Sequence, residues 1–215
     1  PSRVFNSGAP GIDNIVNLDL LSKDKLEENL DWKFSSKSAL FTYHPVTLGK
    51  NDIPRDLKVI LNVLIKTNIN VLFTYANADN GGRFINQKIE EFCRLDPIKY
   101  KVVKSLGQLK YLSAMKHTDL LIGNTSSGII EAASFGKPVV NIGDRQKGRL
   151  KGNNVIDCNL DTLESSINLA ISGDFKEISQ NTHNIYGVGI ASDIILNELV
   201  EQEVFVTKKF IDSIP

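Results

Sequence analysis

Cysteine, long apolar runs and net charge are all scarce in this sequence. Two cysteines far apart in 215 residues cannot form a disulfide framework, so we expect reduced thiols. No stretch reaches the roughly 18 consecutive apolar residues of a membrane-spanning helix. The 25 basic side chains are balanced by 25 acidic ones, and a neutral chain exerts little long-range attraction on nucleic acid or an anionic membrane. These absences favour a soluble, cytoplasmic protein that binds a small molecule and neither nucleic acid nor membrane.

Several common catalytic motifs are missing as well. The sequence has no Gly-x-x-x-x-Gly-Lys-Ser/Thr, no Gly-x-Gly-x-x-Gly after its first predicted strand and no Gly-x-Ser-x-Gly. Their absence argues against an ATPase, a dinucleotide-dependent dehydrogenase and an α/β-hydrolase. The three histidines lack metal-ligand spacing with one another or with the cysteines, so we expect no metal and no cofactor.

From residue 38 onward, short β-rich apolar runs alternate with longer stretches whose apolar residues recur every three or four positions. This alternation is typical of a parallel sheet wrapped by helices. We predict strands over residues 39–43, 71–75, 101–103, 119–123 and 138–142, with 155–158 as a candidate sixth. Helices are predicted over residues 53–66, 82–94, 108–116, 127–135, 163–172 and 191–201. The predicted fold class is α/β, a Rossmann-like parallel sheet with helices on both faces.

The two ends of the chain do not follow this alternation. Residues 1–37 contain a turn-forming segment at 8–11 and a polar amphipathic stretch at 23–30, but no strand–helix unit. Residues 205–210 form a short mixed run after the last predicted helix. We therefore predict a connecting segment over 1–37, a Rossmann-like domain over 38–202 that includes the last helix, and a tail over 203–215.

In a parallel α/β sheet, ligands bind beyond the carboxyl ends of the strands. The fourth predicted strand is followed there by a turn of small polar residues that opens a helix: Thr125, Ser126, Ser127 and Gly128. Such a turn lets the backbone approach a phosphate, and the amides of the first helical turn attract anions. An ordinary helix cap that binds no ligand explains these residues equally well. Glu131 favours the ligand interpretation, because a carboxylate one turn further on can accept two ribose hydroxyls. Phosphate and ribose together indicate a nucleotide.

His44 ends the first predicted strand, beside the rigid Pro45. A histidine at this position can donate to a phosphate or move a proton. The alternative is a structural histidine whose ring is satisfied by a backbone carbonyl. We interpret His117 and His183 as structural or solvated.

Two further segments follow strands. Asn77 lies in an Asn/Asp/Gly-rich stretch after the second strand, where turn geometry alone is an alternative explanation. Arg145, Lys147 and Arg149 follow the fifth strand. A solvated turn explains Lys147, whereas Arg145, nearest the strand end, is the cation we expect to face a phosphate or a base.

Five motifs occur in the order found in the UDP-N-acetylglucosamine 2-epimerases. They are Thr-Tyr-His-Pro-Val-Thr at 42–47, Asn-Ala-Asp-Asn-Gly at 77–81, Gly-Asn-Thr-Ser-Ser-Gly at 123–128 with Glu131, Phe-Gly-Lys-Pro at 135–138 and Gly-Asp-Arg-Gln-Lys-Gly-Arg at 143–149. The sequence resembles this family from about residue 4 to about residue 200. The Asn-x-Ser-Ser-Gly and Arg-Gln-x-Gly-Arg forms resemble the hydrolysing branch, which makes N-acetylmannosamine and UDP for sialic acid biosynthesis.

The resemblance covers only the carboxyl-terminal half of such an enzyme. It implies the second domain of a B-type glycosyltransferase architecture, with the last helix crossing back to a missing N-terminal domain of the same enzyme. It also implies elimination of UDP from UDP-GlcNAc to give a 2-acetamidoglucal, followed by hydration with inversion at the second carbon of the sugar. The carboxylates that move protons belong mainly to the other domain, so we expect this chain to be inactive alone. We expect the full-length enzyme to be a homo-oligomer.

The resemblance also implies a role for each candidate residue. His44 would touch the diphosphate and assist the departure of UDP, and Glu131 would bind the ribose. The phosphates would be held by Thr125, Ser126, Ser127 and Gly128, with Asn77 and Arg145 lining the same cleft. Val188 departs from the family pattern, which often has an acidic residue there, and Thr125 stands where serine is commoner. The identity of the substrate's sugar therefore stays open, and related UDP-sugars with two acetamido groups are among the candidates.

Two other functions share these features. The donor-nucleotide domain of a B-type glycosyltransferase has the same architecture and a similarly placed glutamate that binds ribose, but it needs an acceptor. A non-catalytic nucleotide sensor would bind UDP tightly without consuming UDP-GlcNAc.

Overall fold

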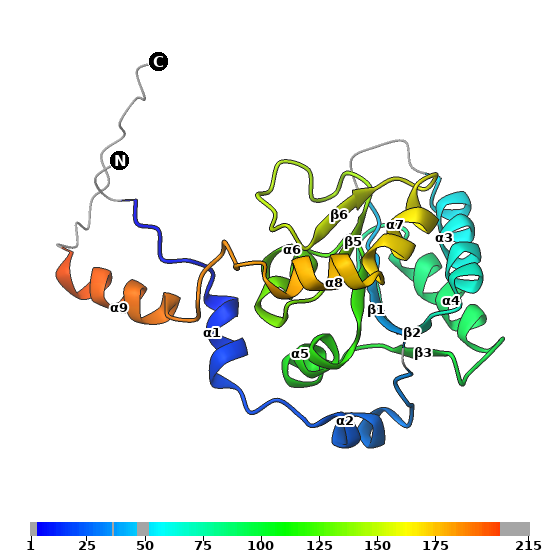
Figure 1. Cartoon of the computed structure of the whole chain (residues 1–215), viewed down its shortest axis with the longest axis horizontal. Coiled ribbons are helices and arrows are strands. Elements are labelled where there is room, and N and C mark those ends of the chain that lie inside the picture. The colour runs from blue at the N-terminus through cyan, green and yellow to red at the C-terminus, as the bar shows by residue number, and fades with distance from the viewer. Residues whose placement is uncertain (1–3, 36, 47–51, 203–215) are drawn as a thin grey trace, which may run out of the picture.

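Six parallel strands form a single sheet in the computed structural model, which describes residues 4–35, 37–46 and 52–202 (Figure 1). The strands are β1 (Ser38–Thr42), β2 (Asn70–Thr74), β3 (Tyr100–Val103), β4 (Leu120–Gly123), β5 (Val139–Ile142) and β6 (Val155–Cys158). Their order across the sheet is β3-β2-β1-β4-β5-β6. The predicted parallel sheet is confirmed, and the candidate sixth strand is β6.

Helices cover both faces of the sheet, because successive strand residues point to opposite sides. Phe41 and Phe73 face the layer of α3 (Ile53–Thr67), α4 (Gly82–Cys93) and α7 (Leu163–Ala170). Leu40 and Leu72 face α2 (Lys23–Leu30), α5 (Gly107–His117) and the 3₁₀ helix η1 (Ala132–Phe135). All four side chains are at most 1% exposed, and each such burial stabilises the fold by about 1.5–3 kcal/mol. The α/β, Rossmann-like fold class is confirmed.

Two helix predictions were wrong in detail. The helix expected over 127–135 is a five-residue α-helix, α6 (Ser126–Ile130), followed by η1, which ends at Gly136 with φ +61°. The stretch after α7 forms a further helix, α8 (Gly173–Gln180), which the sequence analysis missed. Ser172 begins α8 by accepting a hydrogen bond from the Phe175 amide. Serine is preferred before the start of a helix and glycine after its end, so the Ser-Gly pair did not by itself distinguish a start from a stop.

The amino-terminal segment contains two helices, α1 (Pro10–Asn17) and α2, where the sequence analysis expected a turn and an amphipathic stretch. α1 packs beside the last helix, α9 (Ala191–Glu201), away from the sheet (Figure 1). The Asp13 carboxylate accepts hydrogen bonds from the amides of Ala191 (3.0 Å) and Ser192 (2.7 Å). The first turn of α9 is thus capped by a residue 178 positions away in sequence.

α9 leaves apolar side chains on the surface: Leu196, Leu199 and Val200 are 60–76% exposed. No helix within the described ranges is long and apolar enough to cross a membrane. The predicted tail over 203–215 and Thr47 of the first motif lie outside the described residues. The division of the chain into connecting segment, domain and tail stays a prediction.

Candidate nucleotide site at the carboxyl edge of the sheet

The strand order reverses direction between β1 and β4, and open α/β sheets bind ligands in the crevice at such a point. β1 pairs with β2 on one side and with β4 on the other. Gly123 ends β4 with φ +141°, and a Cβ built on it would lie 1.9 Å from the Thr42 carbonyl oxygen. Only glycine therefore allows the chain leaving β4 to pass directly over the end of β1.

Asn124 is the first residue beyond that glycine, and it is 1% exposed. Its side chain makes two hydrogen bonds with the main chain of His44: Oδ1 accepts from the amide (2.7 Å) and Nδ2 donates to the carbonyl (2.8 Å). These bonds continue the β1–β4 pairing one step past the last strand residues. The ends of the two strands are consequently tied together at the crevice.

The imidazole of His44 is oriented from the opposite side. Its Nδ1 lies 3.0 Å from the Asn77 amide nitrogen and accepts a hydrogen bond from it. The neutral ring then carries its proton on Nε2. Burial lowers the pKa of His44, and the charge of Arg145 lowers it further, against an opposing effect of Asp79. His44 is thus held as a neutral hydrogen-bond donor, and the structural contact we considered, a ring bonded to a carbonyl, is replaced by one to a backbone amide.

The loop after β5 reaches the same place. Arg145 Nη1 donates to the Asn124 carbonyl oxygen (3.1 Å), and Gln146 Nε2 donates to the same oxygen (2.8 Å). Gln146 is buried and Arg145 half-buried. Arg145 therefore stands beside His44 at the crevice, while Lys147 and Arg149 lie exposed further along the loop.

The small polar turn after β4 caps α6. Thr125 Oγ1 accepts a long hydrogen bond (3.4 Å) from the Ser127 amide, so this pair satisfies part of the first helical turn internally. A Cβ on Gly128 would lie 2.9 Å from Val139 Cγ1, so this glycine is required for α6 to approach β5. Thr125, Ser126 and Ser127 are half-buried. Because α6 has only five residues, the attraction for anions rests on individual amides and hydroxyls more than on a long helix dipole.

Glu131 lies at the end of α6, half-buried. Burial raises its pKa, and a hydrogen bond with Ser127 offsets part of that effect. A Cβ on Gly11 would lie 3.3 Å from Glu131 Oε1, so the first turn of α1 passes beside this carboxylate. The amino-terminal segment thereby contributes to the surroundings of Glu131, the residue predicted to bind the ribose.

A family model described as UDP-N-acetylglucosamine 2-epimerase matches residues 1–200. This chain belongs to the UDP-N-acetylglucosamine 2-epimerase family. The resemblance drawn from the five motifs is confirmed.

Curated relatives of this epimerase-family chain are about twice as long as it is. A GDP/UDP-N,N'-diacetylbacillosamine 2-epimerase (hydrolyzing) of Campylobacter jejuni is 40% identical over 176 residues, which is 81% of this chain and 46% of the relative. The polysialic acid biosynthesis protein P7 of Escherichia coli is 33% identical over 86% of this chain and 48% of its own length. The chain therefore spans about half the length of these relatives.

A solved structure has the same fold. The UDP-GlcNAc 2-epimerase of Neisseria meningitidis, bound to UDP-GlcNAc, superposes with a TM-score of 0.74 at 20% identity, covering 91% of this chain and 55% of that one. At this identity the likeness concerns the fold alone. It supports the assignment of the sheet to the Rossmann-like architecture of this family.

The structure brings together three of the candidate residues in this epimerase-family chain at the β1–β4 crevice: the Asn77 amide bonds the His44 ring, and Arg145 bonds Asn124, which holds the His44 main chain. Thr125 to Glu131 form the adjoining wall. Two further residues, Asn124 and Tyr111, belong to this group although they were not predicted from the sequence. Asn124 was quoted within a motif, but its contact with His44 spans 80 positions and left no local signal.

Tyr111 comes from α5 and lies under the polar turn. Burial raises the pKa of its hydroxyl, and nearby Glu131 raises it further. Hydrogen bonds with the side chains of Ser127, Thr42 and Thr125 act in the opposite direction. The Tyr111 hydroxyl therefore lies close to the polar turn, a contact that a one-dimensional pattern could not indicate.

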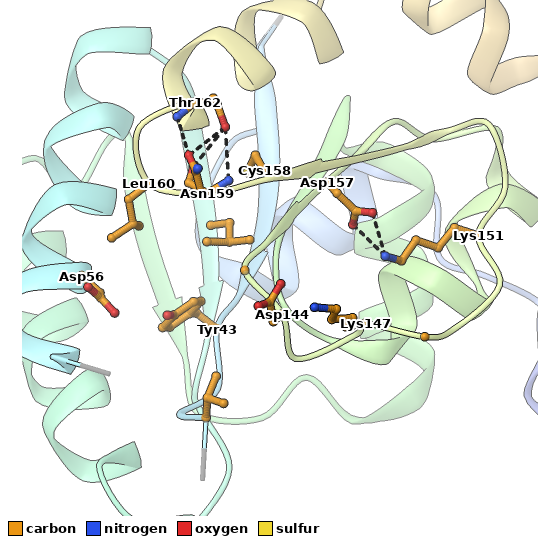
Figure 2. Close-up of a pocket in the computed structure, with 14 residues that line it drawn as sticks. Tyr43, Asp56, Asp144, Lys147, Lys151, Asp157, Cys158, Asn159, Leu160 and Thr162 are labelled. Carbon is orange, nitrogen blue, oxygen red and sulfur yellow. Dashed lines mark hydrogen bonds and ion pairs between the residues drawn. The ribbon is translucent and has the colours of Figure 1, made fainter. Parts of the chain in front are cut away.

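A cavity of about 740 Å³ lies next to this site, lined by the ends of β1, β5 and β6 (Figure 2). Tyr43, Asp56 and Asp144 line it, and Lys151 pairs there with Asp157 at 2.7 Å. Burial and the charge of Asp56 raise the pKa of Tyr43 to about 12. None of the residues predicted to bind the nucleotide lines this cavity.

Proposed function

We propose that this chain is the UDP-binding half of a hydrolysing UDP-sugar 2-epimerase. The whole enzyme would convert UDP-GlcNAc and water into N-acetylmannosamine and UDP. Elimination would break the bond between the sugar's first carbon and UDP and remove the proton from the second carbon. Hydration would return a hydroxyl to the first carbon and a proton to the opposite face of the second.

The observation that carries this proposal is the convergence at the β1–β4 crevice. A neutral histidine, a guanidinium and a turn of hydroxyls meet there, although they come from three separate strand ends. Charge-assisted and neutral donors arranged in this way match the oxygens of a diphosphate. A half-buried carboxylate at the end of α6 completes the pattern with an acceptor for ribose hydroxyls.

Each residue then has a physical role. His44 donates from Nε2 to the diphosphate and stabilises the charge that develops on UDP as it leaves. Arg145 supplies the positive charge, and Asn77 orients the histidine ring through its amide. Thr125 and Ser126 hold phosphate oxygens, with the Ser127 and Gly128 backbone beside them. No metal cluster of histidine, cysteine, aspartate or glutamate is present among the residues that the structure describes, and none of these roles requires one.

A UDP-sugar with two acetamido groups is the second candidate substrate. Two curated relatives, 40% and 30% identical, carry N,N'-diacetylbacillosamine in their names. The Neisseria meningitidis relative named UDP-N-acetylglucosamine 2-epimerase is 26% identical. Since the nucleotide is common to both substrates, the UDP site proposed above serves either sugar.

Other properties of the whole enzyme are proposals as well. The relatives' length supports a further domain of the same enzyme, on the amino-terminal side, that completes the site. Exposed Leu196 and Leu199 on α9 support burial of that helix against this domain or in a homo-oligomer. We place the enzyme in the cytoplasm, in sialic-acid-type biosynthesis.

Calorimetric titration of the 215-residue chain with UDP and with ADP tests the nucleotide site. We expect UDP to bind selectively with a dissociation constant of about 0.1–1 mM, and Glu131→Ala and Arg145→Ala to abolish binding. Glu164→Ala and Arg94→Ala remove exposed charges of surface ion pairs and should bind UDP normally. Equal binding of ADP, or full UDP binding by both site variants, would refute the proposal.

Turnover distinguishes the alternatives. The chain alone should release no UDP from UDP-GlcNAc, whereas the full-length protein should release UDP and a free sugar without any acceptor. A requirement for an acceptor would identify a glycosyltransferase. Tight UDP binding without turnover by the full-length protein would identify a sensor.

A further inference from the structure

Asn124 lies buried at the crevice, between the ends of β1 and β4. It is 1% exposed, so its side chain is closed off from solvent. Nevertheless it makes hydrogen bonds with two separate segments at the crevice, the end of β1 and the loop after β5. Its amide donates to the Thr42 carbonyl (3.1 Å), its side chain bonds both main-chain groups of His44, and its carbonyl accepts from Arg145 and Gln146.

Only a carboxamide can make the two bonds to His44. The His44 amide and carbonyl lie beyond the last residue of β1, so the strand ladder does not pair them. An asparagine side chain presents one acceptor and one donor, like a peptide group, and can satisfy both. An aspartate keeps the acceptor but loses the donor, and it places a carboxylate oxygen against the His44 carbonyl oxygen.

The remaining contact of His44 comes from another strand end. The Asn77 amide fixes the ring through Nδ1, while Asn124 fixes the main chain. The direction of the free Nε2–H is therefore set jointly from the β2 and β4 ends of the sheet. The Asn124 carbonyl holds the Arg145 guanidinium on the same side.

We infer that Asn124 is a positioning residue: its buried side-chain amide fixes His44 and its main-chain carbonyl holds Arg145, which sets the two residues relative to each other for contact with the ligand's diphosphate. Contact of His44 and Arg145 with a diphosphate rests on the proposed function. The hydrogen bonds by which Asn124 holds these two residues do not depend on it. Asn124 acts through His44 and Arg145 and touches no ligand atom itself.

Asn124→Asp tests the inference, with Asn154→Asp as the matched control. Asn154 is also 1% exposed and also donates from Nδ2 to a main-chain carbonyl, that of Lys137 (2.9 Å), far from the crevice. The first readout is histidine ¹³C and ¹⁵N NMR, because the chain has only three histidines. The second is UDP affinity by calorimetry.

We expect His44 of the parent chain to be the Nε2–H tautomer and to titrate below the usual histidine range. The groups that face it are Arg145 from the β5 loop and Asp79 from the β2 loop, which act in opposite directions. Asn124→Asp adds a negative charge beside the ring, so the pKa of His44 should rise and the tautomer signal should change. UDP affinity should fall about tenfold or more, as for a buried polar pair left mismatched. Asn154→Asp should change neither readout.

Asn124→Ser provides a second variant, since its hydroxyl can make one of the two bonds and should give intermediate UDP affinity. Unchanged His44 signals in folded Asn124→Asp, or the same changes in Asn154→Asp, would overturn the inference. If Asn124→Asp does not fold, Asn124→Ser decides: parent-like His44 signals and parent-like UDP affinity in that variant also overturn it. Changed His44 signals in a chain whose parent does not bind UDP would sustain the positioning role and reject the proposed function instead.

Discussion

Replacing Gly123 by alanine should separate the ends of β1 and β4 and so dismantle the crevice. The new Cβ would lie 1.9 Å from the Thr42 carbonyl oxygen and 2.7 Å from its carbonyl carbon. Real Cβ atoms essentially never approach closer than 3.0 Å, so the strands must move apart by about 1.1 Å. Main-chain atoms cannot rotate away, unlike the end of a side chain.

The expected destabilisation has two parts. Alanine at φ +141° is strained by about 1–3 kcal/mol. The displacement also lengthens the Asn124 amide to Thr42 carbonyl bond, now 3.1 Å, and an unsatisfied buried group costs about 1–3 kcal/mol. Together these give about 2–6 kcal/mol, and single substitutions reach the upper part of that range only through such specific mechanisms.

Urea denaturation of Gly123→Ala and of Gly107→Ala measures this difference. Gly107 also has a positive φ (+60°), but a Cβ there meets nothing within 4 Å. It should cost only the strain of the left-handed region, about 1–2 kcal/mol. If Gly123→Ala destabilises no more than Gly107→Ala, the close approach of the two strands is not what requires glycine, and the reasoning fails.

Three further outcomes follow from the charges around the site. Glu131→Gln should raise the free energy of unfolding of the unliganded chain at neutral pH, measured by urea denaturation. The reason is that a carboxylate whose pKa is raised on folding destabilises the folded state above that pKa. The same substitution should weaken UDP binding. Arg145→Ala should raise the pKa of His44 in an NMR titration, because a repelling charge is removed, although burial continues to lower it. Asp13 has a lowered pKa owing to its hydrogen bonds with Ser192, so its contribution is present at neutral pH and lost as the pH falls through that pKa. Asp13→Asn should therefore remove this part of the acid sensitivity and speed hydrogen exchange at the Ser192 amide, and unchanged exchange would argue against the cap.

Much of the fold was predictable because its signals are periodic. The alternation in β1 and β2 that sends Leu40 and Leu72 to one face and Phe41 and Phe73 to the other is a property of strand geometry. The bounds of α9 were predicted without error. Helices with weak start signals were not predicted. α8 begins at a Ser-Gly pair, and α1 begins within a segment that is typical of a turn.

The sequence by itself determined the parallel α/β sheet, the family, and the placement of His44, Asn77, Arg145 and the polar turn at strand ends. Each of these is indicated by residues that lie close together along the chain. Only the tertiary structure decided that His44 is held neutral and that Asn124 joins it to Arg145. The reason is physical: these contacts link residues up to 80 positions apart, and they exist only once the strand order has put β1 between β2 and β4. Hydrogen bonds of that kind have no period, and so no pattern in one dimension predicts them.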